Sequence, residues 1–120
     1  MHGVPANLNL ASFHGATLEY VGLGQYIMTL SFSGDPRPVI GIEGDWELRD
    51  GAGRVLDRQA EPLERDVYRI HLLLGKTVTA SQVDPPRSFS LRFDSGHTLH
   101  VFDRSTQYES FSIQPGNIYI

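Results

Sequence analysis

Four carboxylates surround the only tryptophan of the chain, and they are the residues whose types and spacing could do chemistry. The stretch GIEGDWELRDG holds Trp46 together with Glu43, Asp45, Glu47 and Asp50. Successive side chains of a strand alternate between its two faces, so the first three acids would share one face. Trp46 would then lie on the opposite face, with Ile42 and Leu48.

Three interpretations of this acidic stripe remain open. It is a solvated strand face, where charges usually belong, or a surface that docks a basic protein, or a catalytic carboxylate pair or metal site. No nucleophile, base and orienting group can be assembled from the spacing of the sequence. We therefore predict a protein that is not an enzyme and that needs no cofactor.

The histidines do not predict a metal site. His97 and His100 are three residues apart, and on a strand such residues face opposite sides, so they cannot bind one metal without a bulge. The run DSGH at 94–97 is typical of a hairpin turn, because catalytic triads are assembled from separate segments. GLGQ at 22–25 lacks the third glycine and the following helix of a nucleotide-binding loop, and it also predicts a turn.

Length and composition indicate one folded, cytoplasmic domain. The chain has 120 residues, of which 40% are hydrophobic and 20% charged, in the range of globular proteins. It has no cysteine, which excludes disulfides and fits a reducing compartment. The N-terminus MHGVPANLNLASF does not resemble a signal peptide, and no stretch approaches the ~20 apolar residues that span a bilayer.

The net charge of −4 constrains the partner. Residues 1–60 contain 4 basic and 7 acidic groups (4−7=−3), and residues 61–120 contain 6 and 7 (6−7=−1). A phosphate backbone requires a basic surface, so nucleic acid is a poor candidate. A basic protein would instead be attracted, above all by the first half.

Alternating apolar residues predict strands, and one segment predicts a helix. Alternation is clear at Leu30 and Phe32, and again at Leu91 and Phe93. The helical period follows Pro62 and stops before Gly75, with its apolar positions at Leu63, Val67, Ile70 and Leu74. A shorter helix is predicted over residues 7–14, closed by Gly15.

The two halves of the sequence repeat each other. The pairs of the first half are Gly15/Leu18, Leu30/Phe32, Ile40/Ile42 and Trp46/Leu48, and their counterparts are Gly75/Val78, Leu91/Phe93, Leu99/Val101 and Phe111/Ile113. We predict a single domain over 1–120 with an internal repeat, about 7–58 and 62–120. The predicted fold class is α+β, in which each copy has a short helix followed by about four antiparallel strands. The core should contain Trp46, Leu48, Leu30, Phe32, Leu91, Phe93, Phe111 and Ile113.

The second half resembles a bacterial family of small domains of unknown function. The resemblance rests on LLLGKTV at 72–78, SLRFDSGHTLHV at 90–101 and YESFSI at 108–113. Members of families of this kind are often proposed as immunity proteins that neutralise toxins of bacterial competition. The resemblance implies such a role here, and it implies no catalytic residues.

These observations favour a non-enzymatic protein-binding domain, with an immunity protein against a basic toxin as its specific form. Glu43, Asp45, Glu47 and Asp50 are the predicted partner contacts. The alternative is a structural homo-oligomer that assembles through sheet edges. Its candidate edge is 117–120, where Ile118 and Ile120 are apolar and no lysine or proline protects the strand.

Overall fold

Short runs of alternating apolar and polar residues form strands in both halves of the chain. The computed structural model describes residues 3–59, 67–104, 110–116 and 118–120. Its strands are β1 (Leu18–Leu23), β2 (Met28–Phe32), β3 (Val39–Ile42), β4 (Trp46–Arg49), β5 (Val55–Arg58), β6 (Val78–Asp84), β7 (Ser88–Phe93), β8 (Thr98–Phe102), β9 (Phe111–Gln114) and β10 (Ile118–Tyr119). Two one-turn 3-10 helices, η1 (Ala11–Phe13) and η3 (Ile70–Leu73), precede β1 and β6.

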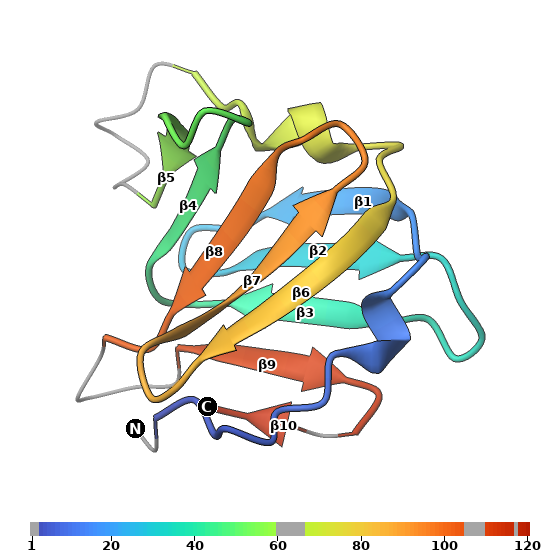
Figure 1. Ribbon diagram of the computed structural model, residues 1–120, viewed down its shortest axis with the longest axis vertical. Helices are drawn as coiled ribbons and strands as arrows, with labels where there is room; N and C mark the ends of the chain where they lie inside the picture. Colours follow the sequence, from blue (N-terminus) through green and yellow to red (C-terminus); the bar gives the residue numbers. More distant parts are fainter. Residues whose placement is uncertain (1–2, 60–66, 105–109, 117) are drawn as a thin grey trace.

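The strands form two five-stranded antiparallel sheets that exchange strands between the halves of the chain. One sheet has the order β1-β2-β3-β9-β10, and the other has the order β5-β4-β8-β7-β6. Each sheet therefore takes three strands from one half of the chain and two from the other. Figure 1 shows β6, β7 and β8 crossing in front of β1, β2 and β3, with β4 beside β8 and β9 beside β3.

The registers of the two exchanged strands correspond. In the first sheet, Ile40 of β3 pairs with Ile113 of β9. In the second, Leu99 of β8 pairs with Leu48 of β4. The neighbouring pairs correspond in the same way, namely Ile42 with Phe111 and Val101 with Trp46. Side chains that lie inward in one sheet thus have counterparts that lie inward in the other.

The two halves also meet in matched backbone hydrogen bonds. The Gly15 N–H donates to the carbonyl of Val78 at 2.9 Å, and the Gly75 N–H donates to the carbonyl of Leu18 at 2.8 Å. Both glycines have a φ of 79°, in the left-handed region that favours glycine. A one-turn helix, a left-handed glycine and an edge strand therefore follow one another in each half.

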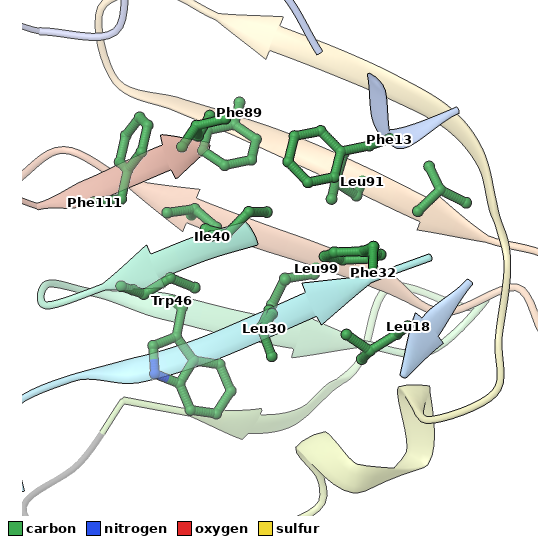
Figure 2. Close-up of a cluster of buried hydrophobic side chains, with 14 of the residues drawn as sticks. Phe13, Leu18, Leu30, Phe32, Ile40, Trp46, Phe89, Leu91, Leu99 and Phe111 are labelled. Carbon is green, nitrogen blue, oxygen red and sulfur yellow. The ribbon is translucent and has the colours of Figure 1, made fainter. Parts of the chain in front are cut away.

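Apolar side chains from both sheets fill the space between them. The eight residues that the sequence predicts as core are all buried, with Trp46 the most exposed of them at 5%, so that prediction is confirmed. Figure 2 shows Trp46 beside Leu30, and Phe89 beside Phe111. Phe89 and Phe111 meet edge-to-face with ring centroids 4.8 Å apart, a favourable aromatic geometry.

The prediction of an α+β fold is wrong, although the antiparallel sheets are present as expected. Strands make up 47% of the described residues and helical residues 7%, and no helix of seven or more residues occurs among them. Residues 7–14 contain only the single turn η1. The helix predicted between Pro62 and Gly75 is reduced to η3 in its described part, and Leu63 lies outside the described residues.

Burial shows why the helical pattern misled. Ile70 and Leu73 are fully buried, while Val67 is 57% exposed and Leu74 is 41% exposed. One 3-10 turn places residues i and i+3 on the same side, so two anchors are enough to hold it on the sheets. The carboxylate of Asp57 fixes its start by accepting the N–H groups of Arg69 at 2.7 Å and Ile70 at 3.0 Å. Leu10 and Phe13 are the corresponding buried pair at η1.

Candidate partner-binding surface

Glu43 lies in the connection between β3 and β4, where the chain passes from one sheet to the other. The backbone N–H groups of Glu43 and Gly44 each donate to the carbonyl of Ser110 at 3.0 Å. Ser110 is fully buried, and Gly44 is buried against it. Hydrogen bonds to a buried residue therefore fix the backbone of the connection, while the Glu43 residue itself is exposed.

Asp45 follows Glu43 by two residues and forms an ion pair with Arg104. Asp45 Oδ2 is 3.6 Å from Arg104 Nη1, and the two side chains are 44% and 56% exposed. The guanidinium carbon of Arg104 also lies 3.8 Å from the ring centroid of Phe102, a cation–π geometry. Because the two charged atoms are well separated and exposed to solvent, the ion pair contributes little to stability. The Asp45 carboxylate thus stays accessible to a partner.

Glu47 is on the outer face of β4, and Arg49 neutralises it. Glu47 Oε2 accepts hydrogen bonds from Arg49 Nε at 3.0 Å and Nη2 at 2.6 Å. Only 19% of the Glu47 side chain is exposed. Two N–H groups that converge on one carboxylate make a charge-assisted contact, which a partner would have to break.

Asp50 organises the turn between β4 and β5. Its Oδ1 accepts the backbone N–H groups of Ala52 and Arg54, both at 2.9 Å. The hydrogen bond from the Arg54 backbone N–H is the main cause that lowers the pKa of Asp50, and the bond from Ala52 and the charge of Arg54 act in the same direction. This is the local side-chain-to-backbone bonding that suits Asp to turns.

The structure therefore separates the four predicted contacts into two pairs. Glu43 and Asp45 lie together at the sheet crossover and present accessible carboxylates. Glu47 and Asp50 are engaged by their own neighbours in the chain. We name Glu43 and Asp45 the acidic corner.

Sequence reasoning missed a row of polar residues across the second sheet. Glu47 of β4 pairs with His100 of β8, and His100 pairs with Ser90 of β7. No side-chain hydrogen bond joins these three described residues. Burial lowers the pKa of His100, and the charge of Arg49 adds to the effect. The only signal in the sequence was the alternation along each strand, which places each of these residues on the outer face. Alternation does not say which strands become neighbours.

Two further histidines make contacts of their own, away from this row. His97 Nδ1 lies 2.8 Å from Ser95 Oγ in the β7–β8 turn, and His14 Nε2 lies 2.6 Å from Ser81 Oγ on β6. Among the residues that the structure describes, no group of three or more His, Asp or Glu side chains is placed to hold a metal ion.

The described parts of the chain contain no helix with the length and apolar character needed to cross a membrane. Comparison with protein-family models, with curated proteins and with solved structures found no match to the chain. Functional inference therefore rests on the residues and their geometry.

Proposed function

We propose that this chain is a non-enzymatic protein-binding domain that recognises a basic protein through its acidic corner. The supporting observation is the attachment of Glu43. Its backbone is hydrogen-bonded to the buried Ser110, while the residue itself is exposed. A carboxylate on a fixed backbone loses less conformational entropy on binding than one on a free loop.

Asp45 adds a second charge to this corner. Its ion pair with Arg104 is 3.6 Å long and half exposed, so the exchange of Arg104 for a partner cation requires little free energy. Two neighbouring carboxylates would also attract a cationic protein before contact, which mainly raises the association rate.

The second half resembles a bacterial family of small domains of unknown function, of a kind often proposed as immunity proteins, and this favours a basic toxin as the partner. The chain's own charge of −4 is complementary to such a protein. The absence of cysteine supports the cytoplasm as the compartment in which the two proteins meet. The proposal contains no catalytic step, and the side chains of Glu47, His100 and Ser90 make no hydrogen bonds to one another.

The experiment first identifies the product of the neighbouring gene, uses it as the partner where it is a basic protein, and compares two single neutralisations. Glu43→Gln removes a charge from the acidic corner, and Asp35→Asn removes one from the exposed connection between β2 and β3. We expect E43Q to slow association by roughly tenfold and to weaken its salt dependence, while D35N changes the rate by less than about twofold. Equal effects of the two variants would show that only the net charge of the protein affects association. That result would overturn the proposal that the acidic corner binds the partner.

The alternative, a homo-oligomer joined at sheet edges, stays a prediction with little support from the C-terminal edge. β10 has only two residues, Ile118 and Tyr119. The N–H of Ile120 donates to Phe111 at 2.9 Å, and its carbonyl accepts from Ser110 at 2.6 Å. So short an edge offers few backbone groups to another chain. Light scattering on a chain that ends at Gly116 tests it, since an edge oligomer would dissociate.

A further inference from the structure

The end of the β1–β2 hairpin exposes large apolar side chains to solvent. Leu23, Tyr26 and Ile27 are 48%, 78% and 41% exposed. With Tyr20, four of the nine exposed large hydrophobic residues in the described ranges lie within residues 20–27. A single exposed apolar side chain is ordinary, whereas a cluster of them marks an interaction surface. We name Leu23, Tyr26 and Ile27 the apolar tip.

Backbone hydrogen bonds hold the apolar tip in place. Leu23 pairs with Met28 at the end of the ladder, and the Gly24 N–H donates to the carbonyl of Ile27 at 2.8 Å. The Ile27 side chain leans onto β3, where its Cδ1 would lie 3.3 Å from a Cβ placed on Gly41. A side chain on an ordered backbone loses less conformational entropy when it binds a partner.

The equivalent hairpin of the second half shows that this framework does not require an apolar turn. The Leu23–Met28 pair ends at the β1–β2 turn. Its counterpart is the pair of Val83 with Phe89, which ends at the β6–β7 turn. That turn reads DPPR at 84–87, and its first and last residues form an ion pair with an N–O distance of 3.1 Å. The apolar tip therefore needs an explanation other than the fold.

The chain covers the second of these two turns with its own segments. The Val4 N–H donates to the carbonyl of Pro86 at 2.9 Å, and Val4 is buried. The carbonyl of Arg87 accepts the N–H of Asp103 at 2.8 Å. Of two equivalent turns, the polar one is thus covered by the chain, while Tyr26 of the other is largely exposed. The apolar tip is accessible to a separate molecule.

The apolar tip adjoins the acidic corner. Met28 of β2 pairs with Ile42 of β3. Ile27 precedes the first of these residues and Glu43 follows the second, so both lie at the same end of neighbouring strands. Figure 1 shows the β1–β2 turn and the β3–β4 connection at this end of the first sheet. Ile27 also lies against Gly41, two residues before Glu43. The apolar tip and the acidic corner therefore form one continuous surface.

We propose that the apolar tip anchors the basic protein that the acidic corner attracts, an inference that rests on the proposed function. Specific interfaces combine an apolar centre, often with tyrosine, and a polar rim, and a few central residues supply most of the binding free energy. The carboxylates beside the tip are complementary to a partner whose apolar pocket is bordered by lysine or arginine. They would repel an anionic lipid surface, so a cationic protein is the favoured occupant.

The two parts of this surface should act on different rate constants. The carboxylates attract the partner before contact, so they mainly raise the association rate. Apolar contacts form only after docking, so their loss mainly raises the dissociation rate. Tyr26 is the most exposed residue of the tip and has the most surface to bury. It should be the principal anchor.

Surface plasmon resonance with the purified basic product of the neighbouring gene tests the inference. We expect Tyr26→Ala to raise the dissociation rate at least about tenfold and to change the association rate by less than about twofold. The matched control is Tyr119→Ala, because Tyr119 is also about half exposed and lies on β10, at the opposite edge of the same sheet. It should change neither rate by more than about twofold.

A second pair of variants repeats the comparison at equal exposure. Ile27 and Leu74 are both 41% exposed. Leu74 precedes Gly75, whose N–H donates to Leu18 at the other end of β1. Ile27→Ala should raise the dissociation rate about threefold to tenfold, and Leu74→Ala should leave it unchanged. All four variants should keep the parent's melting temperature within about 5 °C, since exposed side chains contribute little to folding. If Y26A is unfolded, I27A decides the result.

The outcomes separate a wrong anchor from a wrong function. If Y26A and I27A dissociate as slowly as the parent while E43Q still associates slowly, the acidic corner binds the partner and the inference about the tip is overturned. If the neighbouring product is not basic, or the parent does not bind it, the proposed function fails and this inference fails with it. A parent dimer in sedimentation velocity that Y26A abolishes, with unchanged dissociation from the partner, would show that a second copy covers the tip and would also overturn the inference.

Discussion

Thr17 and Thr77 meet where the two halves of the protein join, with their Oγ1 atoms 2.9 Å apart. Their surroundings correspond, because the Thr17 N–H donates to Ser33 Oγ at 2.9 Å and the Thr77 N–H donates to Asp94 Oδ1 at 3.2 Å. The two residues also pair as an isolated antiparallel bridge. Corresponding positions of the two halves therefore meet directly at this hydroxyl contact.

The contact should couple the two threonines energetically. We expect Thr17→Val and Thr77→Val each to lower the free energy of unfolding by about 1 kcal/mol, the net value of one half-buried hydrogen bond. The double variant should lose less than the sum, because the second substitution removes a hydroxyl that has already lost its partner. Urea unfolding of all four proteins measures the coupling, and strictly additive losses would show that the contact contributes nothing.

Leu73 and Leu74 should respond very differently to truncation. Leu73, the last residue of η3, is fully buried, whereas Leu74 is 41% exposed. Leu73→Ala should lower the free energy of unfolding by about 2–5 kcal/mol, as for other buried leucines. Leu74→Ala should change it by less than about 1 kcal/mol. Chemical denaturation of both variants checks this, and a larger loss for L74A would restore the helical stripe predicted from the sequence.

His100 should make stability depend on pH. Burial and the charge of Arg49 lower the pKa of His100 below 6.5, although Glu47 opposes the shift. The unfolded chain then takes up its proton first as the pH falls, so the stabilising contribution is present above 6.5 and is lost as the pH falls through the folded value. Histidine-ring NMR of the folded protein should give a midpoint below 6.5.

The matched variant for this prediction is His100→Gln, which keeps a polar side chain and cannot titrate in this range. Its melting temperature should fall less than that of the parent when the pH is lowered from about 7.5 to about 5, because one proton uptake on unfolding has been removed. A ring midpoint above 6.5, or an unchanged pH profile in H100Q, would contradict the assignment.

The sequence predicts the strands and the core well, because the period of two is a local property. Leu30, Phe32, Leu91 and Phe93 lie inward as their alternation indicates. The helix was predicted wrongly because apolar residues at helical spacing also fit a 3-10 turn flanked by extended chain. Ile70 and Leu73 carry the burial there, and the exposed Val67 and Leu74 only complete an apparent stripe.

The exchange of strands could not be predicted from local pattern, since it depends on which strand each segment meets. For the candidate site, the sequence showed the four acidic residues but not the residues that each of them contacts. Arg49 is two residues after Glu47, so its position on the same strand face was in principle readable. The contact between Asp45 and Arg104 joins distant segments and needed the fold.

The exchange of β4 and β9 has a consequence for the symmetry of the surface. A chain of half this length with the same strand exchange would be an intertwined dimer, whose stability would depend on its concentration. Joining the halves in one polypeptide turns that bimolecular assembly into an intramolecular one with a high effective concentration. In a homodimer, equivalent positions must carry the same residue. In a single chain they need not, so His100 and Gly41 can differ although they occupy equivalent positions of the two sheets.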